Sequence, residues 1–468
     1  MVRPPSNHSC PLIGGGCIWH PSAVLKFGTD GVRGVANLDL TPEVALALGR
    51  ASARVLGGWR FVIGRDTRLS GPLLEAALVA GLAAEGAQVT SIGVAPTPAV
   101  AWLAAADGVA GAVISASHNP YEDNGVKLFT AGGRKLSDDV EAALEAELHS
   151  ILSHQDHSPT RTGDAVGTVV DGRAEVDRWA ASVVSSIDGR GLDGLRVVVD
   201  CANGAASAVA PRVLRDMGAT VEVLHDEPDG TNINAGCGST HPADVQAAVM
   251  RLGADVGIAF DGDADRVLAV DAEGRLIDGD QIIAVCAIDR HDRQRLAKDT
   301  VVVTVMTNLG FRLGMGAHGI EVREVPVGDR HVLEALADDG LTLGGEQSGH
   351  VVFADLATTG DGLLTAVQLL DVVGRSGRSL AELADAAMTK LPQVLRNVRV
   401  ADKGMDVTAA LADEIAAVEG ELGDHGRVLV RGSGTEPLVR VMVEAPTAIQ
   451  AESAAERLVT AVEDLRPG

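Results

Sequence analysis

Three aspartates at alternate positions form the strongest candidate metal site in this sequence. The segment DGDADR holds Asp261, Asp263 and Asp265 between the apolar runs VGIAF and VLAVD, and carboxylates spaced in this way in a turn can converge on one divalent cation. An EF-hand would need glycine and glutamate where this chain has Arg266 and Ala272. Three monodentate carboxylates leave coordination positions open for a phosphate oxygen, which favours Mg²⁺. A solvated acidic turn is the alternative interpretation.

A serine in the segment ISASHNPYEDNGVKLF could act as a nucleophile or carry a phosphoryl group. The turn signal Asn119-Pro120 follows an apolar strand end and exposes Ser117. No GxSxG elbow surrounds this serine, which argues against a hydrolase triad. Neighbouring side chains on an extended segment point to opposite sides, which weakens the case for His118 as its base. From spacing alone, Ser117 could equally be an ordinary turn serine.

Lys127 follows Ser117 after the turn Asp123-Asn124-Gly125 and could fold back toward the same point. A crowded lysine can lose its proton and serve as a general acid or base. Taken alone, a lysine at such a position is more often on the surface.

Two later segments could bind a phosphate and a polyol. In RGSGTEPLVR, small residues let backbone N–H groups approach an anion, and hydroxyl and guanidinium groups can hold its oxygens. The spacing is not that of a Walker loop, and a plain glycine-rich hairpin turn is the alternative. In GGEQSGH, Glu346, Ser348 and His350 could hydrogen-bond a polyol and move protons. The candidate phosphate ligands are Arg431, Ser433, Gly434, Thr435 and Arg440.

The charge balance limits the partners of this chain. Its 468 residues contain 64 acidic and 39 basic side chains, giving a net charge of −25, which excludes a nucleic-acid binder with a basic surface and disfavours docking on anionic membranes. A small anionic ligand would need cations gathered in one cleft against this charge. We expect that group to comprise Arg33, Arg65, Arg68, Lys127, Arg431 and Arg440.

The cysteines and the N-terminal segment indicate a cytoplasmic protein. The five cysteines are odd in number, scattered and without a CxxC pair, which argues against both a disulfide framework and a zinc site and favours a reducing compartment. The first residues lack the continuous apolar stretch of a signal peptide, and no apolar run is long enough to span a membrane. Residues 1–23 are expected to be a disordered leader or an over-called start.

A threefold internal repeat should position these groups. Apolar runs that end in polar turns alternate with alanine-rich stretches, which is typical of βα units and a parallel or mixed sheet. Each block delivers one polar loop at the end of its third strand, and ligands bind at the carboxyl ends of strands in such sheets. The first strands begin near Arg60, Leu195 and Thr300, the second near Gly86, Gly218 and Gly319, and the third near Gly111, Ala254 and Leu341.

The repeat is followed by a smaller unit, so four domains are expected. The segment KLPQVLRNVRV begins an α+β region that contains a hairpin-like stretch, GRVLVRGSGTEPLVRVMVEA. The expected domains are 24–175 with the serine loop, 176–277 with the metal loop, 278–390 with the sugar loop and 391–468 with the phosphate loop.

Together, FGTDGVRG, SASHNP, DGDADR, GEQSGH and RGSGTEP resemble the α-D-phosphohexomutase superfamily from about Lys26 onward. The resemblance implies three similar α/β/α domains with mixed sheets and a smaller α+β C-terminal domain around one central cleft. It also implies a homodimer, a phosphosugar substrate and one Mg²⁺ per subunit. The implied residues are phosphoserine Ser117, which also contacts the metal ligands Asp261, Asp263 and Asp265, sugar-loop residues Glu346, Ser348 and His350, phosphate-loop residues Arg431, Ser433, Gly434, Thr435 and Arg440, and proton-transfer or positioning residues Arg33, Lys127 and His350.

Several segments, including TVMTNLG and VGDRHVLEAL, look most like bacterial members that act on glucosamine phosphates. That likeness implies interconversion of glucosamine 6-phosphate and glucosamine 1-phosphate through a 1,6-bisphosphate, on the route to UDP-N-acetylglucosamine and cell-wall precursors. Gln347 favours an amino sugar, because an amide can both donate and accept near C2. A phosphoglucomutase or phosphomannomutase, a metal-dependent phosphatase and a non-catalytic binding protein are the alternatives. Gly432 replaces the usual proline and Ala264 a frequent glycine, and both changes leave the proposed ligands in place.

Overall fold

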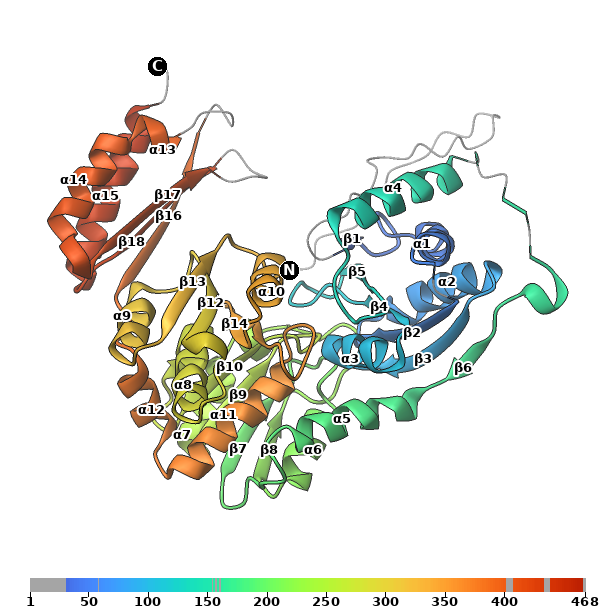
Figure 1. The fold of residues 1–468 in the computed structure, drawn as a ribbon, viewed down its shortest axis with the longest axis horizontal. Helices are drawn as coiled ribbons and strands as arrows, with labels where there is room; N and C mark the ends of the chain where they lie inside the picture. Colours follow the sequence, from blue (N-terminus) through green and yellow to red (C-terminus); the bar gives the residue numbers. More distant parts are fainter. Residues whose placement is uncertain are drawn as a thin grey trace, which may run out of the picture.

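Four β-sheets follow one another along the chain, each with its own helices (Figure 1). The computed structural model describes residues 31–57, 59–153, 155, 158–159, 161–400, 407–432 and 438–465. The expected leader 1–23 and the loop residues Ser433, Gly434 and Thr435 lie outside these ranges. The three described sheets of the repeat and the smaller last sheet confirm the predicted fold class.

Domain 1 contains a six-stranded mixed sheet in the order β1-β5-β4-β2-β3-β6. Strand β2 alternates, so that Phe61 and Ile63 pack with helices on one face and Val62 packs with a helix on the other. Helices α1, α2 and α4 cover the first face and α3 the second. The strands are β1 (Val32–Val35), β2 (Arg60–Arg65), β3 (Gln88–Val94), β4 (Ala110–Ile114), β5 (Asp123–Phe129) and β6 (Val169–Asp171), and the helices are α1 (Pro42–Val55), α2 (Gly71–Ala84), α3 (Thr97–Asp107) and α4 (Asp138–Leu152).

Glycines allow helices α1 and α2 to cross at very short range. A Cβ atom on Gly81 would lie 2.1 Å from the carbonyl oxygen of Leu46, and one on Gly49 would lie 2.2 Å from that of Leu78. The two backbones can therefore touch only because neither position carries a side chain.

Domains 2 and 3 repeat the arrangement with five-stranded and four-stranded sheets. Domain 2 has the order β11-β10-β9-β7-β8, and domain 3 has the order β13-β12-β14-β15. The domain 2 elements are α5 (Val176–Ser185), β7 (Arg196–Asp200), α6 (Ala210–Asp216), β8 (Thr220–Leu224), α7 (Ala243–Leu252), β9 (Val256–Phe260), β10 (Val267–Asp271) and β11 (Leu276–Ile277). The domain 3 elements are α8 (Gly279–Asp292), β12 (Thr300–Thr304), α9 (Leu309–Ala317), β13 (Glu321–Val325), α10 (Asp329–Asp339), β14 (Leu343–Gly345), β15 (Val351–Phe353), α11 (Gly362–Ser376) and α12 (Leu380–Ala387).

The three repeats share one strand pattern. In each sheet the block's first strand lies between the third and the second, all parallel, and an antiparallel return strand pairs with the third. The polar loop that the sequence predicted is in each case the connection from the third strand to its return strand. The predicted strand positions are confirmed, and the repeat places three different loops in equivalent positions.

Domain 4 is a three-stranded antiparallel sheet with the order β16-β18-β17, covered by helices. The glycine-rich segment joins β17 to β18 as the predicted hairpin. The elements are β16 (Gln393–Arg399), α13 (Val407–Ala410), α14 (Ala412–Leu422), β17 (Arg427–Gly432), β18 (Leu438–Glu444) and α15 (Ala448–Asp464).

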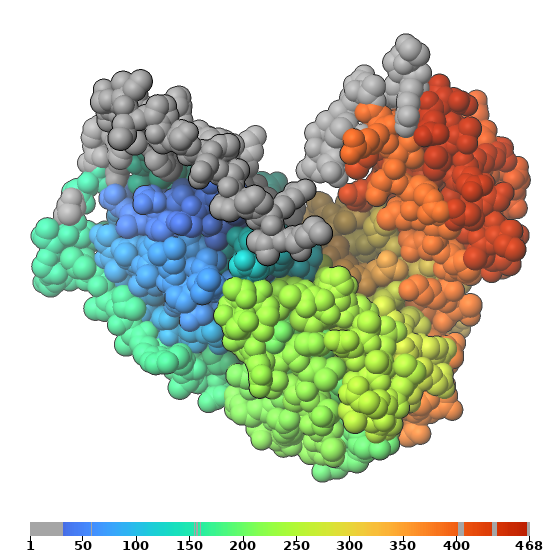
Figure 2. Space-filling model, turned by 180° about the vertical axis from the view of Figure 1, so that it is seen from behind, coloured from blue at the N-terminus to red at the C-terminus, as the bar shows by residue number. Residues whose placement is uncertain are grey.

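Domain 4 is fixed to domain 3 at one end of its sheet. Buried Glu444, the last residue of β18, accepts hydrogen bonds from Leu309 N at 2.9 Å and from Asn308 Nδ2 at 3.2 Å, at the start of α9. Arg427, at the same end of β17, donates to Thr307 O at 2.7 Å. Domain 4 lies across a hollow from domain 1 (Figure 2).

Two expectations drawn from composition can be compared with the described residues. Cys201, Cys237 and Cys286 are buried free thiols. None of the described helices is long and apolar enough to cross a membrane.

Candidate active site

Ser117 lies in the connection between β4 and β5, in a backbone conformation that is rare for serine. Its φ angle is +53°, in the left-handed region, which costs of order 1–3 kcal/mol and is typical of functional sites. Its side chain is buried, and Oγ donates a hydrogen bond to Asp261 Oδ2 at 2.6 Å. The structure therefore brings the predicted phosphoserine of domain 1 into direct contact with the metal loop of domain 2.

This conformation also changes the place of His118. Because Ser117 is not extended, His118 Nδ1 lies 3.4 Å from Ser117 Oγ instead of on the opposite side. The expectation that the two side chains diverge was wrong. Burial, with the charges of Arg266 and Arg33, lowers the pKa of His118.

Arg68 binds the backbone of the serine loop and does not face a site for an anionic ligand. The side chain is completely buried, and Nε donates to Asp66 Oδ2 at 2.8 Å. Its Nη atoms donate to four backbone carbonyls of the loop, those of Ser117 (2.9 Å), Asn119 (2.8 Å), Pro120 and Asp123 (2.9 Å). The prediction that Arg65 and Arg68 face an anionic ligand was wrong, since Arg65 Nε is paired with Glu75 at 2.9 Å.

The three aspartates converge as the spacing predicted. Their carboxylate oxygens lie within 4.8 Å of one another, and all three residues are buried. Burial and the neighbouring carboxylates raise the pKa of Asp261 well above its usual range. Ala264, between two of the aspartates, has a φ of +56°, which explains why glycine is the easier residue there.

This cluster fits a divalent cation. Asp263 Oδ1 and Asp265 Oδ1 are buried and have no hydrogen-bond partner among the described residues, and buried carboxylate oxygens without donors are costly. An Mg²⁺ ion takes such hard oxygen ligands. The three carboxylates are therefore the residues that would hold it.

Lys127 belongs to the same cluster. It lies on β5, opposite Val113 of β4, and its Nζ is 2.6 Å from Asp263 Oδ2 and 3.1 Å from Asp265 Oδ2. Burial alone would raise the pKa of Asp265, but the ammonium group holds it well below its usual range. The lysine does fold back from the serine loop to the predicted point.

The sugar loop approaches the same cluster from domain 3. His350 is buried, with Nδ1 3.8 Å from Asp265 Oδ1 and Nε2 3.6 Å from Asp329 Oδ2. Burial alone would lower its pKa, but the Asp265 carboxylate raises it. Glu346 is half-buried and accepts from Gly328 N at 3.1 Å, and Ser348 is exposed. Three loops from three domains thus meet around Asp265.

Gln347 faces the junction with domain 4. Its Nε2 lies 3.3 Å from Asp280 Oδ2 and 3.5 Å from Asp278 Oδ2, the latter paired with Lys390. Its amide is therefore engaged by carboxylates of α8, which removes support for a role in reading the sugar's C2 substituent.

The described part of the phosphate loop presents two arginines side by side. Arg431 of β17 and Arg440 of β18 are direct cross-strand partners. Partial burial and the charge of Arg440 lower the pKa of Arg431. Like charges facing each other across strands are unfavourable unless an anion lies between them, so this pair suits a phosphate. Gly432 is an exposed strand end, with open space at its Cβ position.

Arg33 lies beside the return strand that follows the serine loop, and its charge contributes to the lowered pKa of His118. It lies on β1, opposite Gly125 of β5, and a Cβ atom on Gly125 would lie 2.9 Å from Arg33 Cγ.

Sequence reasoning missed two groups that fix this geometry. Thr97, the first residue of α3 after the carboxyl end of β3, donates to Asp263 Oδ2 at 2.7 Å. Asn234 of domain 2 donates to Ser117 O at 2.9 Å and Asn119 O at 3.2 Å. The rule that ligands gather at carboxyl ends of strands could have found Thr97, but no sequence pattern marks Asn234.

Comparisons with known proteins agree with this architecture. Protein-family models described as phosphoglucomutase/phosphomannomutase domains I, II, III and IV match residues 24–155, 177–274, 278–391 and 395–461. The phosphoglucosamine mutase of Frankia alni is 56% identical over 455 residues, covering 94% of this chain and 98% of its own. That of Acidothermus cellulolyticus is 56% identical over 448 residues, covering 94% and 95%.

Solved structures show the same fold. A phosphoglucomutase/phosphomannomutase family protein of Burkholderia thailandensis superposes with a TM-score of 0.79 at 27% identity, covering 94% of this chain and 98% of its own. The Aspergillus fumigatus N-acetylphosphoglucosamine mutase in complex with GlcNAc-6P and magnesium gives a TM-score of 0.67 at 20% identity, covering 94% and 96%. The chain therefore belongs to the phosphoglucomutase/phosphomannomutase family, within which it is similar over nearly its full length to bacterial phosphoglucosamine mutases.

Proposed function

We propose that this chain is a phosphoglucosamine mutase, an isomerase that interconverts glucosamine 6-phosphate and glucosamine 1-phosphate for UDP-N-acetylglucosamine and peptidoglycan synthesis. The observation that carries the proposal is the contact of 2.6 Å between Ser117 Oγ and Asp261 Oδ2, inside a cluster that Lys127 and His350 complete. A hydroxyl aimed at a carboxylate triplet suits phosphoryl transfer. The identity of the relatives supports the choice of the amino sugar.

In the first step, the bond between Ser117 Oγ and phosphorus breaks and a bond forms between phosphorus and O1 of the 6-phosphosugar. The product is a 1,6-bisphosphate and a free serine. The proton leaving O1 needs a nearby base, and we propose Lys127 and His350, both buried beside Asp265. Arg33 is proposed to position the reacting hydroxyl.

In the second step, the bisphosphate is reoriented and its 6-phosphoryl group is transferred to Ser117, which leaves the 1-phosphosugar. Glu346 and Ser348 are proposed to hold the sugar in both orientations. Arg431 and Arg440, with Ser433, Gly434 and Thr435, are proposed to hold whichever phosphate is not transferred.

One divalent cation per subunit, held by Asp261, Asp263, Asp265 and an oxygen of phospho-Ser117, would neutralise charge that develops on the transferring group. A phosphoserine exposed to water would hydrolyse. We therefore propose that domain 4 closes over the hollow seen in Figure 2 when the sugar binds.

Intact mass with phosphosite mapping tests the central assignment. The active protein should carry one phosphate on Ser117, and Ser117→Ala should lose both the phosphate and isomerisation. Ser376→Ala, at the exposed end of α11, is the matched control and should change neither. Full activity of Ser117→Ala would overturn the proposal, as would release of inorganic phosphate at the rate of substrate loss, which would indicate a phosphatase.

The substrate is tested by kcat/KM for glucosamine, glucose and mannose phosphates, of which the first should be largest. A higher value for glucose or mannose phosphate would make the chain a phosphoglucomutase or phosphomannomutase.

We further propose a homodimer without nucleic-acid or membrane partners, located in the cytoplasm, with domain boundaries at 24–175, 176–277, 278–390 and 391–468. The buried free thiols Cys201, Cys237 and Cys286 support a reducing compartment.

A further inference from the structure

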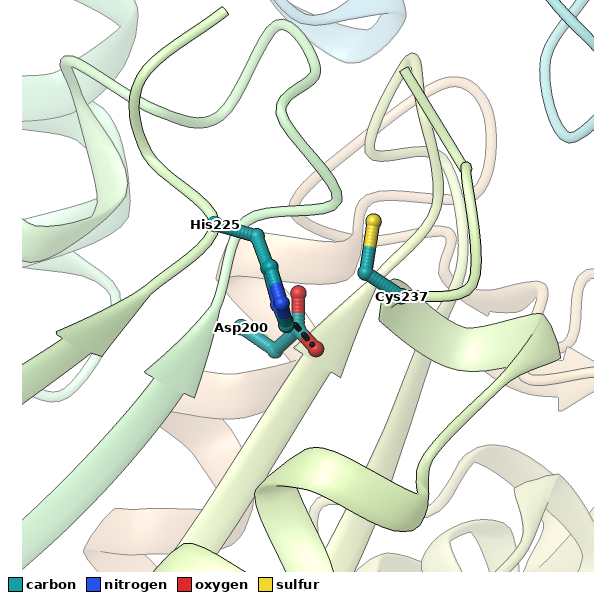
Figure 3. Close-up of side chains that lie close together, drawn as sticks. All are labelled: Asp200, His225 and Cys237. Atoms are coloured by element: carbon teal, nitrogen blue, oxygen red, sulfur yellow. Dashed lines mark ion pairs between the residues drawn. The ribbon is translucent and has the colours of Figure 1, made fainter. Parts of the chain in front are cut away.

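A second cluster of metal-ligating side chains lies in domain 2, outside the residues assigned above. Asp200 ends β7, His225 follows β8, and Cys237 precedes the 3₁₀ turn Gly238–Thr240. One ligand atom from each residue lies within 4.8 Å of the others. Figure 3 shows Asp200 and His225 at the ends of two neighbouring strands and Cys237 beside them, before the 3₁₀ turn. The spacing in the sequence does not reveal this group, because the three residues come from three separate segments.

The imidazole of His225 is oriented like that of a metal ligand. Its Nε2 is 3.3 Å from Asp244 Oδ2, which suits a proton on that nitrogen. Its Nδ1 is buried and 3.0 Å from Asp200 Oδ2, but it makes no hydrogen bond. Metal-binding histidines commonly donate their second ring N–H to a carboxylate, which turns the other lone pair to the ion. A lone pair and a carboxylate oxygen at 3.0 Å are stabilised by a cation between them.

The carboxylate of Asp200 is held in place by backbone groups. Oδ1 accepts from Ala202 N at 2.9 Å and Oδ2 accepts from Gly238 N at 3.0 Å. His225 has a φ of +51°, and its carbonyl accepts from Asn203 N at 2.7 Å. A non-glycine residue in this conformation is costly and indicates a constrained position.

The third group is a buried thiol. Cys237 is 1% exposed, and one ligand atom from each of Asp200, His225 and Cys237 lies within 4.8 Å of the others. Its sulfur therefore completes a set of one oxygen, one nitrogen and one sulfur ligand.

We propose that Asp200, His225 and Cys237 bind a borderline-soft divalent cation of the Zn²⁺ type. Sulfur and imidazole ligands select zinc over Mg²⁺, whose preferred ligands are all oxygen. Three protein ligands leave a fourth tetrahedral position for water.

The bound cation would stabilise the loop between His225 and Cys237, which contacts the serine loop. The segment between Asn232 and Cys237 includes Asn234, which holds the carbonyls of Ser117 and Asn119, and Asn234 N donates to Ala202 O at 2.9 Å. A cation bridging Cys237 to Asp200 and His225 therefore fixes Asn234 against the serine loop. Its role is to position, not to take part in phosphoryl transfer.

Cobalt binding tests the site through its sulfur ligand. The untagged full chain is saturated with Mg²⁺, so that the oxygen-only cluster is occupied, and is then titrated with Co²⁺. A thiolate–cobalt charge-transfer absorption should appear in the near ultraviolet. Zn²⁺ should remove this absorption by displacement and should raise the Tm of the Mg²⁺-saturated protein.

Two variants and two matched controls identify the ligands. His225→Asn should fold, because asparagine tolerates a positive φ, and should weaken Co²⁺ binding by about 10-fold or more. Cys237→Ser should abolish the absorption. Cys286→Ser removes another buried thiol and His241→Asn another histidine of the same domain, and both should retain it. No absorption in the parent protein, absorption that survives in Cys237→Ser, or unchanged Co²⁺ affinity in His225→Asn would each overturn the proposal and leave a His–Asp pair beside an inert thiol.

Discussion

Replacing the buried Arg68 by methionine should destabilise the serine loop much more than the loss of a surface arginine would. The substitution keeps the buried aliphatic bulk but leaves Asp66 buried without its cation, and it removes the donors to four loop carbonyls. Breaking a buried ion pair by removing one partner costs about 3–5 kcal/mol. At about 1.4 kcal/mol per tenfold, this corresponds to roughly 100-fold to 4,000-fold greater opening of the loop.

Hydrogen exchange of the amides of β4 and β5 in the full chain measures this opening, with isomerisation measured alongside. Arg65→Met is the matched control. Its partner Glu75 is near the surface, with side-chain exposures of 21% and 14% for the pair, and the expected loss is about 1 kcal/mol or less.

The pH dependence of stability shows whether the unpaired carboxyl of Asp66 causes the loss. Burial, against the opposing charge of Arg68, already raises the pKa of Asp66. Without Arg68 this pKa must rise further, so the stability of the variant should fall as pH increases above about 4, where the unfolded carboxyl ionises. Asp66→Asn in the Arg68→Met background should remove that dependence. If the amides of β4 and β5 exchange at the same rate in Arg68→Met and Arg65→Met, the role of Arg68 in holding the serine loop would be refuted.

Three further predictions concern other contacts. Lys127→Met should lower kcat by about 10²–10⁴-fold, whereas Lys390→Met, whose partner is Asp278 at the domain junction, should leave kcat nearly unchanged in the same assay. Burial raises the pKa of Asp280 to about 7. The folded state therefore holds this proton more tightly than the unfolded chain, and stability falls as pH rises from about 4 to 7. Asp280→Asn should flatten this part of a plot of unfolding free energy against pH, whereas Asp338→Asn, on the exposed face of α10, should not. Gly81→Ala should separate α1 from α2 and cost about 1–3 kcal/mol of unfolding free energy. Gly316→Ala, in the last turn of α9 with open space at its Cβ position, should stabilise by up to about 1 kcal/mol. Equal effects on the thermal transition would contradict the packing argument.

Local patterning was sufficient to predict the layered domains and the convergence of the three aspartates. Strand runs such as RFVIGR carry their own periodicity and end in turn residues, so each element could be located from its neighbours in the chain. The repeat also predicted that the loops of Ser117 and Asp261 face one cleft, whereas their direct contact was an expectation from the family resemblance.

Contacts between distant segments could not be predicted in this way. The sequence predicted that Arg68 faces an anionic ligand, and only the fold shows that its guanidinium donates to four carbonyls of another loop. His118 was misplaced because the positive φ of Ser117 is imposed by tertiary contacts and not by local preference. The spacing of Asp200, His225 and Cys237 in the sequence did not predict their cluster, because only the tertiary fold brings these three residues together.

The attachment of domain 4 has a mechanical consequence. The edge strand β17 and the central strand β18 are both attached to domain 3 at one end, through Arg427 to Thr307 and through Glu444 to the start of α9. Gly432 and Leu438 lie at the opposite end of these two strands. The seven residues of β18 span about 20 Å at roughly 3.4 Å per residue. A rotation of only about 10° around the pinned end would carry the hairpin through about 3.5 Å over that length. A small rotation about the contacts with α9 would therefore move the far end of β17 and β18 by about the length of one hydrogen bond to a phosphate.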